Sequence, residues 1–157
     1  MKMAALQMVS GTDLSANLAT ARRLLEQSAH LGAELAVLPE YFCRMGQRDA
    51  DKLTLAEQPG HGPIQAMLGQ AARELGLWVV GGTLPIATPD PARVANTTLV
   101  FNPAGECAAR YDKIHLFRFD NGRERYDEAA VLVRGHEPVS FTLTPREGSP
   151  LRVGLSV

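Results

Sequence analysis

The spacing of apolar residues changes several times along the chain, and each change predicts a different structural element. Residues 2–8 are largely apolar and predict a strand. After Asp13, apolar side chains recur at intervals of three and four from Leu14 to Ala29, which predicts an amphipathic helix. Asp13 suits the cap at the start of this helix, and Gly32 suits the left-handed position that ends it.

Two later stretches, 35–38 and 77–80, are apolar at every position, as expected for strands that are covered on both faces. Between them the helical spacing returns over residues 64–75. Pro63 favours the start of that helix and Gly76 favours its end. The alternation of strand and helix predicts an α/β layered fold with helices on one side of a sheet.

After Gly82 the helical spacing disappears, and we expect a loop containing Pro85, Pro89 and Pro91. Strands are predicted at 97–101, 107–111, 139–143 and 151–157. The first two should form a hairpin, because residues 102–105 have the composition of a turn. No domain boundary interrupts the pattern. Natural domains seldom finish within an uncovered strand such as 151–157, although an ordinary terminal strand is the alternative.

The composition narrows the classes of protein. A length of 157 residues with 45% hydrophobic content is typical of one globular domain. A formal net charge of -1 without a long Lys/Arg cluster argues against a nucleic-acid partner. No apolar run approaches the ~20 residues of a membrane span, and no signal peptide is recognisable, so we expect no membrane partner and a cytoplasmic protein.

Glu40 and Lys113 are the first candidates for chemistry. Glu40 follows strand 35–38 at its carboxyl end, where open α/β sheets form ligand crevices, and is a candidate general base. A glutamate in that position alone is more often a solvated loop residue. Lys113 lies in the largely apolar segment 111–117, so its ammonium group needs a carboxylate or a substrate oxyanion as partner. A surface lysine is the alternative.

Several segments, taken in order, resemble the signatures of the nitrilase superfamily of carbon–nitrogen hydrolases. They are Leu-Pro-Glu at 38–40, Asn-Thr-Thr-Leu-Val and Asn-Pro-Ala-Gly within 96–105, Tyr-Asp-Lys-Ile-His-Leu-Phe at 111–117, and Tyr-Asp-Glu-Ala at 126–129 followed by Arg-Gly at 134–135. Each is short, but their joint occurrence in this order is specific. The form of 111–117 is most similar to the branch that contains omega-amidase and deaminated-glutathione amidase.

The resemblance implies a role for each charged residue. Glu40 corresponds to the general base, Lys113 to the cation that stabilises the tetrahedral intermediate, and Glu128 to a second carboxylate that positions the triad or the substrate. The nucleophile of this family is a cysteine directly after a strand that resembles 151–157, so we expect it immediately beyond Val157. Residues 1–157 would then be the N-terminal portion of a single domain, about the first half of a four-layer α-β-β-α sandwich.

The activity implied by the resemblance is hydrolysis of a non-peptide C–N bond in a small amide, or a nitrile, through a thioester. A small carboxylate-bearing amide is the preferred substrate class, no cofactor is needed, and a homodimer or larger homo-oligomer is expected. Residues 1–157 alone should be inactive. The alternative is a truncated, non-catalytic family member that binds a ligand or a partner chain.

Other candidate sites are weaker. Cys43 lies three residues from Glu40, but a nucleophile there would leave Lys113 unexplained. Cys107 is expected to be a small buried apolar residue, and both thiols should be free. The histidines at 30, 61, 115 and 136 lack further ligands at metal-binding spacing. The mixed charges of 118–127 are typical of a solvated loop.

Overall fold

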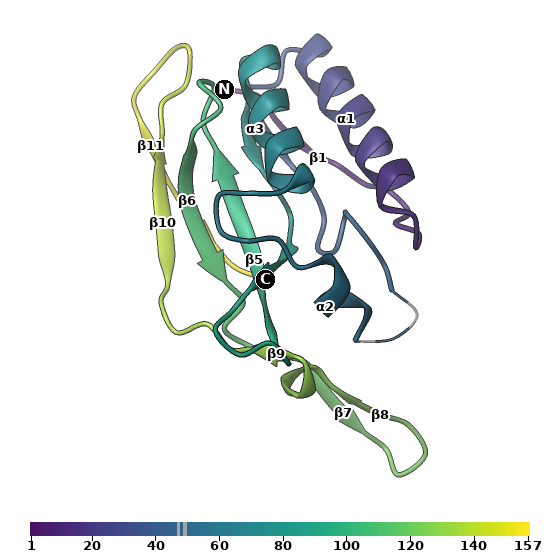
Figure 1. The fold of residues 1–157 in the computed structure, drawn as a ribbon. Coiled ribbons are helices and arrows are strands. Elements are labelled where there is room, and N and C mark those ends of the chain that lie inside the picture. The colour runs from purple at the N-terminus through teal and green to yellow at the C-terminus, as the bar shows by residue number, and fades with distance from the viewer. Residues whose placement is uncertain (47, 49) are drawn as a thin grey trace.

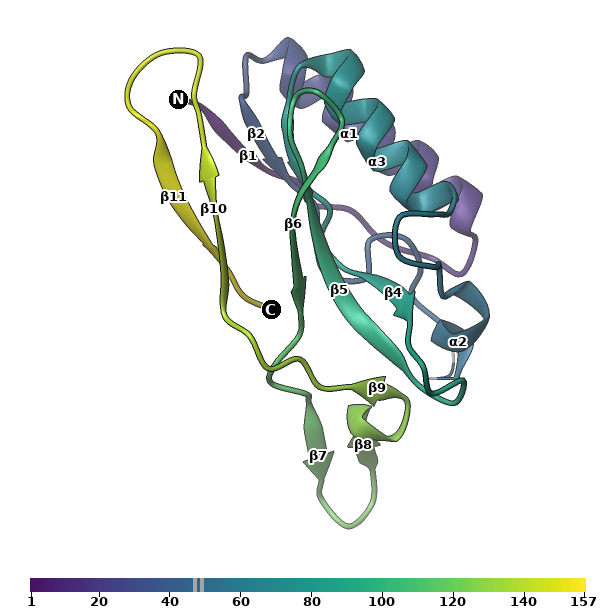
Figure 2. The same cartoon turned by 60° about the vertical axis from the view of Figure 1, so that its left-hand side comes forward.

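The computed structural model describes residues 1–46, 48 and 50–157. A seven-stranded sheet lies between two helices on one face and a two-stranded sheet on the other (Figures 1 and 2). The strands of the large sheet are β1 (Met3–Ala5), β2 (Leu35–Val37), β3 (Trp78–Val80), β4 (Leu84–Ala87), β5 (Val94–Phe101), β6 (Cys107–Asp112) and β9 (Leu132–Val133). Strands β1, β2 and β3 are parallel, and β5 pairs with β3 in the antiparallel sense.

Both predicted long helices are present and cover the same face of the large sheet. Helix α1 (Leu14–His30) begins where the Asp13 side chain accepts a hydrogen bond from a backbone N–H, and Gly32 follows its end with φ 79°. Helix α3 (Pro63–Leu75) ends at Gly76, which is left-handed with φ 62°. Their apolar faces and one face of the sheet enclose the larger core. The prediction of helices on one side is confirmed.

The opposite face of the large sheet is covered by the hairpin of β10 (Val139–Leu143) and β11 (Leu151–Leu155). A second apolar cluster lies between them, where the rings of Trp78 and Phe141 stack with their centroids 5.6 Å apart. Because this hairpin lies face to face with the large sheet, the chain contains part of a sheet-on-sheet sandwich.

Three segments differ from the sequence prediction. Strand β4 occupies the expected proline loop, since Pro85 is tolerated in a strand that ends the sheet order next to β5 and carries only an isolated bridge to Glu57 on its other side. The short helix α2 (Asp51–Leu55) was not expected. The charged run 118–127 forms a second hairpin, β7 (Arg118–Asp120) and β8 (Arg125–Asp127), which projects away from the large sheet and is followed by the 3-10 turn η1 (Glu128–Ala130) (Figures 1 and 2).

Within the described residues, no helix is long and apolar enough to cross a membrane.

The start of helix α3 depends on a buried carboxylate. Glu57 is 7% exposed, and its two carboxylate oxygens accept hydrogen bonds from the backbone N–H of Ile64 at 2.6 Å and of Gln65 at 3.1 Å. Gln65 adds a side-chain hydrogen bond to the same carboxylate at 3.0 Å. Glu57 therefore caps α3 from outside the helix and satisfies donors that the helix leaves free.

Replacing Glu57 with alanine should lower the free energy of unfolding by about 2–3 kcal/mol, because two buried N–H groups lose their acceptor. Urea unfolding of the full-length protein measures this change. Glu147→Ala is the matched control, since Glu147 is exposed and should change stability by less than roughly 0.5 kcal/mol. Equal effects of the two substitutions would contradict the capping role.

Candidate active site

The three charged residues that the sequence singled out lie together in the structure. Nζ of Lys113 is 2.9 Å from Oε1 of Glu40 and 3.0 Å from Oε2 of Glu128. Glu40 follows β2, Lys113 directly follows β6 and Glu128 begins η1, so separate parts of the chain supply the cluster. The predicted convergence is confirmed, while the roles of the residues stay predictions.

Close backbone packing fixes the turn that carries Glu40. Gly82 has φ 45°, and a Cβ atom at this position would lie 2.1 Å from the carbonyl oxygen of Pro39. Only glycine allows the segment between β3 and β4 to approach the Pro39–Glu40 turn so closely. The position of the Glu40 carboxylate therefore depends on a residue with no functional side chain.

Lys113 is held by its backbone as well as by its side chain. Its N–H donates to the carbonyl oxygen of Asn96 at 2.9 Å, and its own carbonyl oxygen accepts from the N–H of Gly135 at 2.9 Å. Gly135 is required at this contact, because a Cβ atom there would lie 2.1 Å from the carbonyl oxygen of Asp112. The backbone of Lys113 is thus fixed on one side to Asn96 in β5 and on the other to Gly135, which follows β9.

Burial and charge act in opposite directions on Lys113. The residue is 7% exposed, and burial by itself would lower the pKa of its ammonium group. Hydrogen bonds and charge attraction from Glu40 and Glu128 outweigh burial, so the pKa lies above its ordinary value. Lys113 is therefore cationic at neutral pH, and the expected need for a carboxylate partner is met.

The two carboxylates differ in their remaining capacity to accept a proton. Oε1 of Glu128 accepts from the Tyr41 hydroxyl at 3.2 Å, and its Oε2 accepts from the Phe117 backbone N–H at 2.7 Å. Both oxygens also face Lys113, at 3.3 Å and 3.0 Å. The Glu128 side chain is only 12% exposed, so its arrangement is suited to positioning.

Glu40 presents one free oxygen. Its Oε1 accepts from Nδ2 of Asn96 at 2.8 Å and from Nζ of Lys113 at 2.9 Å. Among the described residues, no hydrogen bond to Oε2 of Glu40 is formed, and the side chain is 38% exposed. Of the two carboxylates, Glu40 is the one that can take a proton from an approaching group.

Sequence reasoning missed two members of the cluster, Asn96 and Tyr41. Asn96 is 1% exposed in β5, a strand whose eight residues are all buried. A polar run inside an otherwise apolar strand is a usable signal, because buried polar groups need partners. Tyr41 gave no signal beyond its place after Glu40.

Neither cysteine occupies the cluster. Cys43 is 1% exposed in the core beneath the helices, and burial raises the pKa of its thiol to about 12. A thiol that stays protonated at neutral pH is a poor nucleophile, which argues against the Cys43 alternative. Cys107 is exposed, so the prediction that it is buried is wrong; β6 lies at an edge of the sheet and leaves it uncovered.

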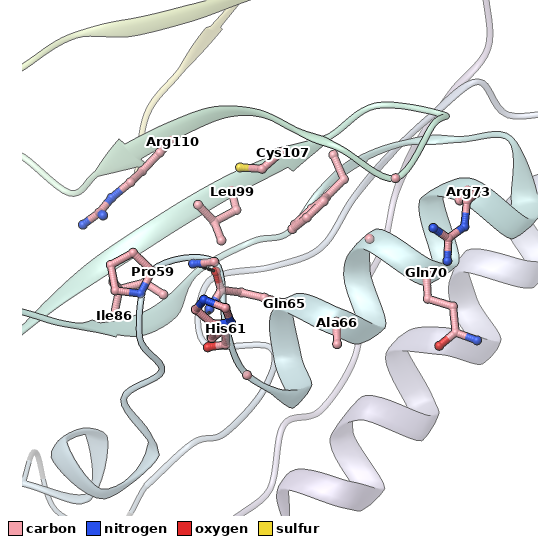
Figure 3. A pocket seen from close by; sticks show the side chains of 15 residues that line it. Pro59, His61, Gln65, Ala66, Gln70, Arg73, Ile86, Leu99, Cys107 and Arg110 are labelled. Carbon is pink, nitrogen blue, oxygen red and sulfur yellow. Dashed lines mark hydrogen bonds between the residues drawn. The ribbon is translucent and has the colours of Figure 1, made fainter.

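Two cavities differ in their relation to the cluster. One of about 400 Å³ is lined by Glu40, Thr83 and the end of the chain from Val153 to Val157. The other, of about 770 Å³, contains none of the three charged residues. Figure 3 shows that helix α3 and the strands of the large sheet line this second cavity from opposite sides. The smaller cavity is therefore the one that opens onto the candidate base.

Among residues 1–46, 48 and 50–157, no group of three or more His, Cys, Asp or Glu side chains could hold a metal ion. The four histidines are all exposed.

Comparison with known proteins identifies the family. The model of the carbon–nitrogen hydrolase family matches residues 2–157. The chain belongs to this family. This carbon–nitrogen hydrolase chain is 34% identical over 150 residues to deaminated glutathione amidase of Yersinia enterocolitica. The aligned region covers 93% of the chain and 52% of that protein. It is 32% identical over 131 residues to a chloroplastic omega-amidase of Arabidopsis thaliana, covering 81% of the chain and 35% of that protein.

Solved structures confirm the fold of the carbon–nitrogen hydrolase chain. The NitFhit protein of C. elegans superimposes with a TM-score of 0.78 at 29% identity, over 87% of the chain and 34% of that structure. XC1258 from Xanthomonas campestris, a CN-hydrolase superfamily protein with an arsenic adduct in its active site, gives 0.62 at 31% identity, over 85% of the chain and 46% of that structure. The chain spans about half or less of the length of these relatives, so it carries a partial carbon–nitrogen hydrolase fold.

Proposed function

We propose that the full-length protein hydrolyses the C–N bond of a small amide through a cysteine nucleophile, with Glu40 as general base. The observation that carries this proposal is the buried ammonium group of Lys113, 2.9 Å from a glutamate whose other oxygen is free. A base and a cation that close together can act on one reacting carbon. Two similar proteins are named as amidases, which favours an amide over a nitrile.

The nucleophile in this proposal is a cysteine that directly follows Val157. Ser156 and Val157 line the same 400 Å³ cavity as Glu40, so the next residue of the chain would emerge beside the base. Residues 1–157 would then form the N-terminal portion of one catalytic domain and would be inactive alone, because neither Cys43 nor Cys107 lies in the cluster. The full domain would be a four-layer α-β-β-α sandwich.

The first half of the reaction forms a thioester. Oε2 of Glu40 takes the proton of the thiol, and the thiolate attacks the amide carbon to form a C–S bond. The electron pair of the carbonyl moves to its oxygen, and the resulting negative charge is stabilised by the ammonium group of Lys113. When the C–N bond breaks, the proton held by Glu40 passes to the leaving nitrogen, and ammonia departs.

The second half hydrolyses the thioester. Glu40, again unprotonated, removes a proton from water, and the hydroxide attacks the thioester carbon. Lys113 stabilises the second oxyanion, the C–S bond breaks, and Glu40 returns its proton to the thiolate. The product is a carboxylic acid. Glu128 holds Lys113 in place throughout, and the chemistry needs no cofactor.

The preferred substrate class is a small amide that carries a carboxylate, in keeping with the names of the two amidases. A nitrile is the less favoured substrate. A cytoplasmic location and assembly into a homodimer or larger homo-oligomer stay predictions.

Ammonia release by the full-length protein, measured over a panel of amides, nitriles and carbamoyl compounds, tests the proposal. We expect turnover of carboxylate-bearing amides and an intact mass increased by the acyl group when the reaction is quenched. A full-length protein that folds but releases no ammonia from any of them would favour the non-catalytic alternative, a ligand- or partner-binding family member.

A further inference from the structure

Tyr41 has an unusual backbone conformation for an aromatic residue. Its φ is 53°, and it is the one non-glycine residue with positive φ in the described part of the chain. A bulky L-residue is strained in the left-handed region and persists there only where its surroundings hold it. Strain of this kind concentrates at functional sites, and Tyr41 directly follows the candidate base Glu40.

Contacts on several sides hold Tyr41 in this conformation. Its backbone N–H donates to Oγ1 of Thr83 at 2.9 Å, and its carbonyl oxygen accepts from the N–H of Arg44 at 3.2 Å. The ammonium group of Lys52 lies 4.7 Å from the centroid of its ring, within the range of a cation–π interaction. The backbone and the ring are therefore fixed independently of the hydroxyl group.

The left-handed conformation has a geometric consequence for the site. In extended backbone, consecutive side chains point to opposite faces, so Glu40 and Tyr41 would diverge. Here both reach the groups around Lys113. Oε1 of Glu40 is 2.9 Å from Nζ of Lys113, and the hydroxyl of Tyr41 donates to Oε1 of Glu128 at 3.2 Å. Tyr41 thus connects the turn of the base to a carboxylate 87 residues away in the sequence.

We propose that Tyr41 is a positioning residue whose hydroxyl fixes Glu128, so that Lys113 stays between the two carboxylates. The inference rests on the proposed amidase function. Without the hydroxyl, Oε1 of Glu128 loses a neutral donor and attracts Lys113 more strongly. The ammonium group would then move toward Glu128, away from Glu40 and from the oxyanion that forms in the reaction.

The substitution Tyr41→Phe in the full-length protein isolates the hydroxyl, because it keeps the ring and the backbone contacts. We expect kcat to fall by about tenfold, the effect of losing one hydrogen bond to a charged group. KM should change by less than about twofold, since the positioning role assigns the hydroxyl to Glu128 and not to the substrate. Thermal unfolding should give a Tm close to that of the unsubstituted protein.

Two further variants separate the hydroxyl from other causes. Tyr126→Phe removes the hydroxyl of an exposed tyrosine in β8 and should leave kcat unchanged. Tyr41→Asn introduces a residue that tolerates the left-handed region but has no phenol group. This variant should remain folded and lose activity at least as strongly as Tyr41→Phe.

The outcomes distinguish this inference from the proposed function. If the unsubstituted protein releases no ammonia from any amide, the proposed function is overturned and the inference falls with it. If that protein is active and Tyr41→Phe retains its kcat, only the positioning role is overturned. A fall in activity that merely follows a fall in Tm, or one confined to KM, would also overturn the positioning role.

Discussion

Replacing Glu40 with glutamine in the full-length protein should lower kcat by roughly 10²–10⁴-fold while leaving the fold intact. Glutamine has nearly the same shape, and its carbonyl oxygen can still accept from Asn96 and Lys113 in place of Oε1. The free position of Oε2 then carries an NH₂ group, which cannot take a proton from a thiol or from water. The loss should appear in single-turnover measurements, because it concerns the chemical steps.

Two comparisons make the Glu40 experiment specific. Glu137→Gln changes an exposed glutamate outside the site and should leave kcat and Tm unchanged. Glu128→Gln should reduce stability as well as activity, because both oxygens of Glu128 are occupied by donors and one would be replaced by an NH₂ group. Near-normal turnover by Glu40→Gln, with activity abolished by a folded Glu128→Gln protein, would reverse the roles assigned to the two carboxylates.

The helices of the fold were predictable because local signals coincide with the tertiary structure. The predicted limits of α3 agree with those observed, since Pro63 favours a helix start and Gly76 takes the left-handed conformation that ends it. Strand β4 was not predictable by the same reasoning, because Pro85 signals a loop unless the strand is known to lie at an edge. Edge positions depend on the whole sheet.

Some residues of the candidate site were likewise indicated by the sequence, and others were not. Lys113 and Glu40 were candidates because of a charge beside apolar residues and a carboxylate at the end of a buried strand, but it was the ordered resemblance to the nitrilase superfamily that favoured them over a surface lysine and a solvated glutamate. The contribution of Tyr41 was not, since it depends on a positive φ and on a hydrogen bond across 87 residues. The burial of Cys107 was predicted wrongly because hydrophobicity says nothing about which strand lies at the edge of a sheet.

Replacing Lys113 with methionine should reduce both catalysis and stability in the full-length protein. Turnover should fall by about 10²–10³-fold, the effect of removing one group that stabilises an oxyanion. The free energy of unfolding should fall by roughly 3 kcal/mol, because two carboxylates would share a site without their cation. This loss of unfolding free energy is at the lower end of what breaking a buried ion pair costs, because Glu40 is 38% exposed and water screens its charge.

A double substitution separates the two losses. In Lys113→Met/Glu128→Gln one of the two negative charges is gone, so part of the lost stability should return while turnover stays low. Equal recovery of stability and activity would mean that Lys113 acts only by holding the fold. Urea unfolding and ammonia release on the same samples make the comparison.

The pH dependence of stability gives an independent check on Lys113. Its pKa in the folded protein is raised above the ordinary value of 10.5, so the ion pairs stabilise the fold fully at pH values below 10.5. That stabilisation is lost as the pH rises through the raised pKa and the ammonium group gives up its proton. The difference in unfolding free energy between the unsubstituted protein and Lys113→Met should therefore stay constant from neutral pH to about pH 10 and shrink above it. A difference that has already disappeared near pH 8 would mean that Lys113 is neutral in the folded protein, and a neutral amine could not stabilise an oxyanion.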